Sequence, residues 1–212
     1  MSRFTTGRTR VKICGLTQEQ DVDAAVAAGA DALGFVLWPG SKRAIDVQRL
    51  AQLASRVPAF VTRVGLFVDQ PMDFIRRCEP YLDLVQYHGN ESPDFCGQTM
   101  RPWIKALRMR EGLDVEAAAK AYDKARGLLL DAYRPGVPGG TGDTFDWSRI
   151  PASLEKPVIL AGGLTATNVD EAIRAVRPYA VDVSGGVERS PGIKDLARIH
   201  AFFDQVSLAQ HS

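Results

Sequence analysis

The sequence has few cysteines, no long apolar run and no excess of charge of either sign, and each shortage excludes a class of protein. Its three cysteines, Cys14, Cys78 and Cys96, are far apart and form no CxxC pair, which argues against a disulfide framework and a thiolate zinc site. No segment approaches the ~18 apolar residues of a membrane helix, and no signal-peptide core follows the basic start MSRFTTGRTR. We therefore expect a reduced, soluble, cytoplasmic protein.

The charge balance and the length set further limits. A formal net charge of +1 provides no bulk attraction to nucleic acid or to an acidic membrane. The chain of 212 residues, 45% hydrophobic and 24% charged, is long enough for one sizeable core or two small ones. We expect residues 11–206 to form a single domain, residues 1–10 a flexible N-terminal extension and residues 207–212 a C-terminal tail.

Short apolar runs alternate with segments of helical spacing from Val11 onward. Helices are predicted over residues 17–28 and 46–57, with Thr17 and Asp46 as N-caps and Gly29 as the stop of the first. Further helices are predicted from residues 71, 92, 113, 167 and 194, with only a short segment after Trp147 for the sixth. The apolar runs, from residues 11, 30, 63, 84, 103, 127, 157 and 180, are VKICG, ADALGFVL, RVGLFV, LVQYHG, WIKALR, GLLLDAY, PVILAGG and AVDVSGGVE.

Eight such units indicate an α/β protein whose parallel strands close into a single (β/α)8 barrel, the TIM barrel. A doubly wound open sheet is the alternative. It would need a single fingerprint loop, and the glycine loops of this chain lie at the wrong end for GxGxxG.

In a barrel, side chains at the carboxyl ends of the strands face the active site. The alternation of a strand points Lys12 and Cys14 inward if Val11 and Ile13 meet the helices. Lys12 and Asp182, on adjacent strands, are expected to form a buried ion pair. The same rule turns a second set of polar side chains inward on other strands: Gln86, His88, Asp131, Asp182 and Ser184.

Glycines gather in the loops after the last three strands. Without a Cβ, such residues let backbone N–H groups crowd around an anion. The convergence of three loops, aided by the Ser184 hydroxyl, predicts a phosphate site. The glycines are Gly140 and Gly142 after the sixth strand, Gly162 and Gly163 after the seventh, and Gly185 and Gly186 after the eighth.

The motifs together resemble the phosphoribosylanthranilate isomerase family from Val11 to about Phe203. They are VKICGLT, GADALGFV followed by SKR, VGLFV, VQYHG, LLLDAY, GGTGDTFDW, AGGLTATNV, AVDVSGGVE and PGIKD, in this order. The resemblance implies an isomerase of tryptophan biosynthesis that carries out the Amadori rearrangement of N-(5-phosphoribosyl)anthranilate to 1-(2-carboxyphenylamino)-1-deoxyribulose 5-phosphate. It assigns Cys14 as general base and Asp131 as general acid, and Arg43 of SKR as the group that binds the anthranilate carboxylate.

The residues themselves suit this chemistry. Ring opening needs a proton on the ribose ring oxygen, and enolisation needs one removed from the neighbouring carbon, tasks for a carboxylic acid and a thiol on separate strands. Both pKa values must approach neutrality, and Lys12 is a candidate for lowering that of the thiol. No metal or cofactor motif appears, so we expect a small phosphorylated molecule as the only ligand and a monomer or homodimer.

Other interpretations stay open. Cys14 is a core residue in the simplest alternative, and His88 only supports a loop. A related isomerase of histidine biosynthesis resembles this enzyme but uses aspartates as both acid and base and binds two phosphates. A phosphosugar-binding barrel without catalysis is a third possibility. A Schiff-base aldolase would need Lys12 or Lys105 as its nucleophile.

Overall fold

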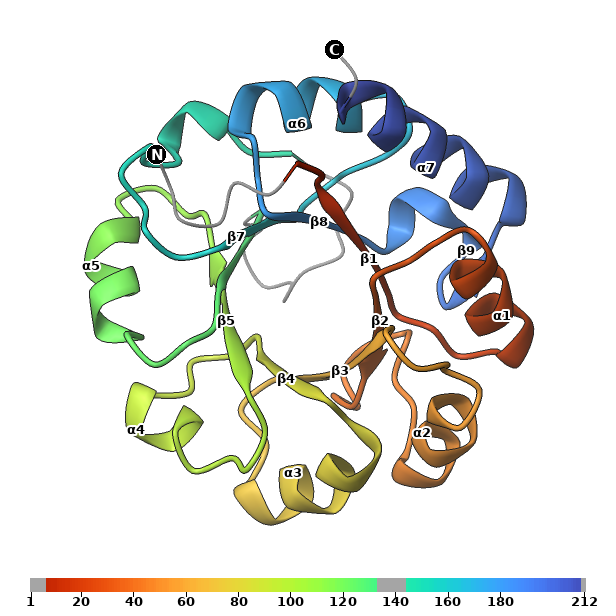
Figure 1. Cartoon of the computed structure of the whole chain (residues 1–212). Helices are drawn as coiled ribbons and strands as arrows, with labels where there is room; N and C mark the ends of the chain where they lie inside the picture. The colour runs from red at the N-terminus through yellow and green to blue at the C-terminus, as the bar shows by residue number, and fades with distance from the viewer. Residues whose placement is uncertain (1–6, 133–143, 211–212) are drawn as a thin grey trace.

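The computed structural model describes residues 7–132 and 144–210, and eight parallel strands in it close into a barrel. The strands pair in chain order, and the last closes the ring against the first, with Lys12 opposite Asp182. Helices surround the barrel (Figure 1). The predicted (β/α)8 barrel is confirmed. The strands are β1 Arg10–Cys14, β2 Ala32–Val36, β3 Thr62–Phe67, β4 Leu84–Tyr87, β5 Trp103–Arg108, β6 Leu128–Asp131, β7 Val158–Leu160 and β8 Ala180–Val183.

The helices begin and end at the residues that local chemistry favours. The predicted N-cap Asp46 accepts a hydrogen bond from the N–H of Arg49 at 2.7 Å. Gly29 follows the first helix with φ of 93°, a left-handed conformation that glycine adopts without cost. The helices are α1 Glu19–Ala27, α2 Val47–Ala54, α3 Met72–Cys78, α4 Pro93–Cys96, α5 Val115–Ala121, α6 Val169–Val176 and α7 Leu196–Gln210, with a short 3-10 helix, η1 Glu79–Tyr81, after α3.

Two of the helix predictions are wrong. Thr17 does not cap α1, because the N-cap is Gln18 and the Thr17 hydroxyl donates instead to the carbonyl of Gly192 at 2.5 Å. The segment after Trp147 forms only a 3-10 turn, η2 (Trp147–Arg149), where the sixth helix was expected.

The chain departs from the plain repeat after β8. A 3-10 turn, η3 (Gly185–Val187), leads into an antiparallel hairpin of β9 (Glu188–Ser190) and β10 (Ile193–Lys194). Gly192, with φ of 82°, lies within the hairpin turn, where glycine meets the left-handed conformation that other residues avoid. The hairpin therefore adds two short strands beside the barrel.

This hairpin corrects the prediction for the end of the chain. The apolar run from Ala180 forms a strand only as far as Val183, since the glycines that follow have no side chains to pack in a sheet. Lys194 lies in β10, and α7 begins at Leu196, with the side chain of Asp195 accepting a hydrogen bond from its first turn. The helix continues to Gln210, into the segment expected as a tail.

The core has two layers, as the alternation of the strands requires. Outward side chains such as Ile13 and Phe35 pack against the helices. Each complete burial of such a side chain contributes ~1.5–3 kcal/mol relative to exposure. The inner layer fills the barrel and consists of Ile104, Ala106, Leu129, Ile159, Ala161 and Ala180.

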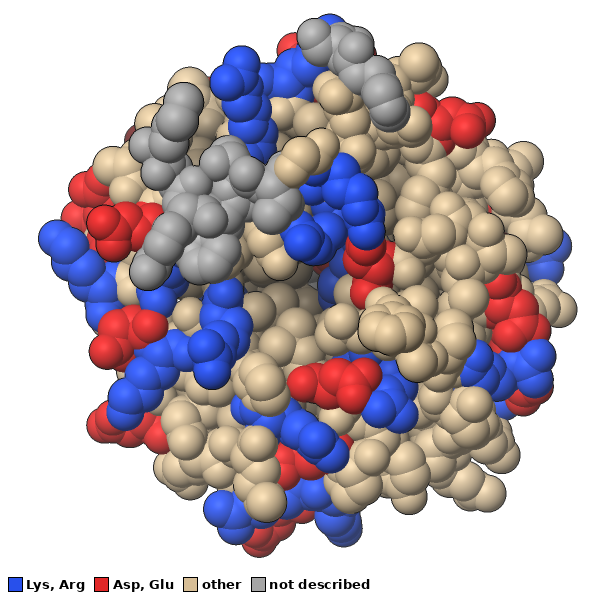
Figure 2. Space-filling model, in the orientation of Figure 1, with Lys and Arg blue, Asp and Glu red and all other residues tan. Residues whose placement is uncertain are grey.

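Charged side chains of both signs are interspersed on the face of the molecule seen in Figure 2. No broad area of one sign is visible there, in line with the net charge of +1. In residues 7–132 and 144–210, no helix has both the length and the apolar character needed to cross a membrane.

Candidate active site

A cavity of about 240 Å³ opens where the strands end. Every site residue predicted in the described part of the chain lines it, whereas Gly140 and Gly142 lie outside the described residues. Four strands and the loops after them thus bring a thiol, a carboxyl group, an imidazole and a guanidinium to one space. The predicted residues in the lining are Cys14, Arg43, His88, Asp131, Gly162, Gly163, Ser184, Gly185 and Gly186.

Cys14 ends β1 and is only 5% exposed. Gly34 is its neighbour on β2, and a Cβ at that position would lie 2.8 Å from the Cys14 sulfur and 3.0 Å from Nζ of Lys12. The first distance is too short for a carbon atom and the second is tight, so this glycine leaves the space in which the thiol and the ammonium group meet.

Opposing effects act on the pKa of the Cys14 thiol. Burial, the largest, raises it, and the charge of Asp182 raises it further, whereas Lys12, through its charge and a hydrogen bond, and Lys194 lower it; the net shift is upward. The pKa is therefore above the ordinary thiol value. The expected Lys12–Asp182 ion pair is confirmed, with Nζ 2.7 Å from Oδ1. Lys12 lowers the thiol pKa as predicted, but burial and Asp182 together make the net shift upward.

Asp131 ends β6 and faces His88, which follows β4. Oδ2 of Asp131 lies 3.2 Å from Nε2 of His88, and both side chains are less than 10% exposed. The contact is one of proximity, because Nε2 forms no well-aligned hydrogen bond with any residue that the structure describes. Nδ1 lies 3.0 Å from Nε2 of Gln86, a side chain inside the barrel. His88 therefore stands between Gln86 and the carboxyl group.

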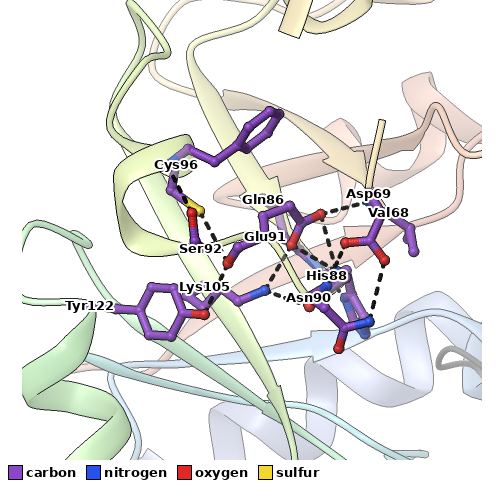
Figure 3. A network of polar contacts seen from close by, with 12 residues as sticks. Val68, Asp69, Gln86, His88, Asn90, Glu91, Ser92, Cys96, Lys105 and Tyr122 are labelled. Carbon is purple, nitrogen blue, oxygen red and sulfur yellow. Dashed lines mark hydrogen bonds and ion pairs between the residues drawn. The ribbon is translucent and has the colours of Figure 1, made fainter. Parts of the chain in front are cut away.

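A polar network outside the barrel holds the loop that carries His88 (Figure 3). Glu91 accepts hydrogen bonds from the N–H of Asp69 at 2.9 Å and that of Gly89 at 3.0 Å, and Nζ of Lys105 lies 2.8 Å from its carboxylate. Lys105 also donates to the carbonyl of Gly89 at 2.7 Å and is absent from the cavity lining. Lys105 is therefore not placed to form a Schiff base with a ligand in this cavity.

Arg43 reaches the cavity from the loop after β2 and is already paired with a side chain of the protein. Its Nε and Nη2 donate to the two carboxylate oxygens of Glu188 at 2.8 and 2.7 Å. Burial alone would raise the pKa of Glu188, but Arg43 and Lys194 hold it below its ordinary value. Glu188 and Lys194 belong to the AVDVSGGVE and PGIKD motifs, but neither was among the predicted site residues.

The glycine loops present backbone donors to the cavity. Gly162 and Gly163 have φ of 87° and 62°. Among the described residues, the N–H groups of Gly163, Gly185 and Gly186 donate no hydrogen bond to the protein, and the buried hydroxyl of Ser184 has no partner there either.

A side-chain amide fixes one of these loops. Asn168 donates to the carbonyl of Gly163 at 3.0 Å, and its oxygen accepts from the N–H of Thr165 at 2.9 Å. Asn168 therefore fixes the loop after β7 through other groups, and the N–H of Gly163 stays available for a ligand.

Part of the cavity wall is apolar, and its residues were not predicted from the sequence. Val36, Trp38 and Leu66 form it. A Cβ on Gly40 would lie 2.3 Å from the Trp38 ring, so the indole packs directly on this glycine. Trp38 lies two positions after the end of β2, and this place near a strand end was the sequence feature that could have indicated it. The direction of its indole, however, depends on the conformation of the loop. In the described part of the chain no cluster of three or more His, Cys, Asp or Glu is suited to a metal ion.

The fold and the cavity define a (β/α)8-barrel enzyme with a thiol and a carboxyl group facing a common space. The family model described as N-(5'phosphoribosyl)anthranilate (PRA) isomerase matches residues 11–205. The N-(5'-phosphoribosyl)anthranilate isomerase of Chromohalobacter salexigens is 76% identical over 203 residues, covering 96% of each chain, and that of Pseudomonas putida is 57% identical, covering 94% of this chain and 98% of the relative. This chain belongs to the phosphoribosylanthranilate isomerase family.

Solved structures of the same family are also similar to this chain. The phosphoribosylanthranilate isomerase of Thermotoga maritima is 40% identical with a TM-score of 0.86, covering 94% of this chain and 98% of that one. A structure of the enzyme in complex with reduced 1-(o-carboxyphenylamino)-1-deoxyribulose 5-phosphate is 39% identical with a TM-score of 0.83, with the same coverage.

Proposed function

We propose that this protein catalyses the Amadori rearrangement of N-(5-phosphoribosyl)anthranilate to 1-(2-carboxyphenylamino)-1-deoxyribulose 5-phosphate in tryptophan biosynthesis, with Cys14 as general base and Asp131 as general acid. The observation that carries the proposal is the cavity that both side chains line together with Arg43 and the glycine loops. Membership of the isomerase family supports it.

The reaction begins with a proton from Asp131. The carboxyl group donates to the ring oxygen of the ribose while the anthranilate nitrogen's lone pair forms a double bond to C1, so the C1–O bond breaks. The Cys14 thiolate then removes the proton from C2, and the electron pair moves to give an enolamine. Loss of the enol proton and protonation of C1 yield the ketose, and proton exchange with water resets both groups. Each acid–base contribution is worth roughly 100- to 10,000-fold.

Groups that suit both charged ends of the substrate line the cavity. The substrate carboxylate pairs with Arg43 through the part of its guanidinium that Glu188 leaves unused, and the aromatic ring packs beside Trp38. The phosphate is held by the N–H groups of Gly163, Gly185 and Gly186, with the Ser184 hydroxyl near them. We expect the enzyme to act on this small phosphorylated substrate in the cytoplasm.

The test is a turnover assay. Phosphoribosylanthranilate is generated in situ, and the loss of its fluorescence is followed after adding the protein. Fast decay with the wild type, and none beyond the uncatalysed rate with Cys14→Ser or Asp131→Asn, supports the proposal. No turnover by the wild type, with product still bound, would favour a non-catalytic phosphosugar-binding barrel. Preference for the aminoaldose phosphate of histidine biosynthesis would favour that isomerase.

A further inference from the structure

A cluster of buried charges lies beside Arg43, where the β9–β10 hairpin meets the barrel. Oε1 of Glu188 accepts hydrogen bonds from three donors: Nε of Arg43 at 2.8 Å, Nζ of Lys194 at 2.9 Å and the N–H of Gly192 at 3.3 Å. The side chains of Glu188 and Lys194 are 4% and 0% exposed. Water therefore does not screen these charges, and their positions are fixed by the protein.

Two basic side chains, Arg43 and Lys194, share the carboxylate of Glu188. A second buried carboxylate, Asp21, accepts a hydrogen bond from the backbone N–H of Lys194 at 2.9 Å, and burial lowers the pKa of Lys194. A half-buried guanidinium with an unused donor favours a further anionic partner. Among the described residues, Nη1 of Arg43 has no hydrogen-bond partner, and Arg43 lines the cavity. A carboxylate on a ligand would supply the missing acceptor.

Lys194 connects this cluster to the thiol. Its Nζ donates to the carbonyl of Cys14 at 2.6 Å and approaches that of Ser184 at 3.2 Å, in addition to Glu188. One ammonium group thus joins the end of β1, the end of β8 and the carboxylate that holds Arg43. The backbone of the proposed base and the proposed anchor of the substrate share this support.

We propose that Glu188 and Lys194 are positioning residues for recognition of the substrate carboxylate. Glu188 holds the guanidinium of Arg43 side-on and leaves Nη1 for the substrate, and Lys194 fixes Glu188 to the strand end that carries Cys14. The inference rests on the proposed function, in which Arg43 binds the anthranilate carboxylate. An arginine fixed before the substrate arrives loses no rotamer freedom on binding, so the paired Arg43 is a better anchor than a free one.

The experiment compares two ligands with Glu188→Gln. One is the product, and the other is the same phosphosugar with a phenylamino group that lacks the ring carboxylate. We expect product affinity to fall about 10- to 100-fold, the range for a hydrogen bond to a charged group, and affinity for the second ligand to stay unchanged. KM should rise more than kcat falls, because the contact exists before and during the reaction. Glu188→Asp, which keeps the charge, should recover part of the loss.

The matched control is Asp83→Asn. Asp83 accepts from Nε and Nη2 of Arg63 at 2.8 and 2.6 Å, the same side-on geometry, but it precedes β4 and so lies at the opposite end of the barrel. We expect neither ligand to bind differently to this variant. A loss specific to the product in Asp83→Asn would show that a general effect of breaking ion pairs is responsible and would overturn the inference.

Arg43→Ala separates this inference from the function on which it rests. If Arg43→Ala weakens both ligands equally, the proposed role of Arg43 is wrong. If it weakens only the product while Glu188→Gln weakens both equally or neither, only the positioning role is overturned. Should Glu188→Gln fail to fold, Glu188→Gln/Lys194→Met removes both buried charges at similar volume. That variant is expected to show the same loss for the product alone, and wild-type affinity in it would overturn the inference.

Discussion

Nε2 of His88 lies 3.2 Å from Oδ2 of Asp131, with both side chains almost completely buried at the carboxyl ends of their strands. Gln86 lies on the other side of the imidazole, 3.0 Å from Nδ1. The imidazole lines the cavity beside the carboxyl group, so it limits the orientations that this group can adopt. His88 and Asp131 are therefore predicted to act together, with unequal importance.

Asp131→Asn should abolish turnover, because an amide keeps the size of the side chain but has no acidic proton for the ring oxygen. We expect kcat to fall by roughly 100- to 10,000-fold while product affinity is kept. His88→Gln should lower kcat by a smaller factor, since it disturbs only the orientation of the acid. Single-turnover kinetics and product titration measure both. A larger loss in His88→Gln than in Asp131→Asn would make His88 the proton donor.

Cys14→Ser should likewise remove turnover, because a hydroxyl group does not ionise near neutrality. Product binding should remain, as neither the phosphate nor the carboxylate contacts this residue in the proposal. The double variant Cys14→Ser/Asp131→Asn should lose less than the two single losses combined, since the residues serve one sequence of proton transfers. Near-normal kcat in Cys14→Ser would make the cysteine core packing, with His88 as the next candidate for the base.

The pH profile of kcat/KM should respond to Asp182→Asn. Burial raises the pKa of Cys14, and Asp182 contributes to that rise. The base is active only when ionised, so activity increases with pH through the thiol pKa. Removing the carboxylate lowers the thiol pKa and moves the acidic limb of the profile to lower pH. Asp170→Asn, at an exposed pair with Arg174 on α6, serves as control and should leave the limb in place. A shift of the limb to higher pH in Asp182→Asn would contradict the assignment.

Gly186→Ala tests the phosphate loops together with local packing. A Cβ at Gly186 would lie 2.0 Å from the carbonyl oxygen of Leu164, so the loops after β7 and β8 must separate. The variant should weaken product binding and destabilise the fold by ~1–3 kcal/mol, the usual cost of overpacking. Any side chain larger than that of glycine at position 186 is therefore expected to lower the stability of the fold. Gly185→Ala meets only Nη2 of Arg43 at 3.4 Å and is the control for stability. Equal melting temperatures for both variants would contradict the packing argument.

Trp38 should report on the aromatic ring of the ligand. If the ring packs beside the indole, Trp38→Ala raises KM through the loss of a contact worth ~0.5–1.5 kcal/mol beyond its buried area. Product binding should quench the tryptophan fluorescence of the wild type more than that of the variant, which keeps Trp103 and Trp147. Identical quenching in both proteins would contradict the packing of the ligand's aromatic ring against Trp38.

The chain order of strands and helices was readable from the sequence because it depends on local periodicity. Because the side chains of a strand alternate between its two faces, the apolar residues of β1 that face the helices leave Lys12 and Cys14 pointing into the barrel. The pairing of β1 with β8 then places Asp182 opposite Lys12. The cavity residues Cys14, Asp131 and His88 could be predicted for the same reason, since they lie at or directly after strand ends, whereas Arg43 was predicted only from the family resemblance. Helix boundaries that were predicted from a single capping side chain were less reliable. Thr17, for example, donates a hydrogen bond to the carbonyl of Gly192 instead of capping α1.

The partners of these side chains were decided only by the tertiary structure. Arg43 and Glu188 are separated by 145 positions, and Lys194 and Cys14 by 180, so no local pattern relates them. Their contacts arise because the barrel closes and the β9–β10 hairpin folds beside β1. The sign of the thiol pKa shift has the same origin: Lys12 is visible two residues from Cys14, but the burial that outweighs its charge exists only once the strands have closed around both.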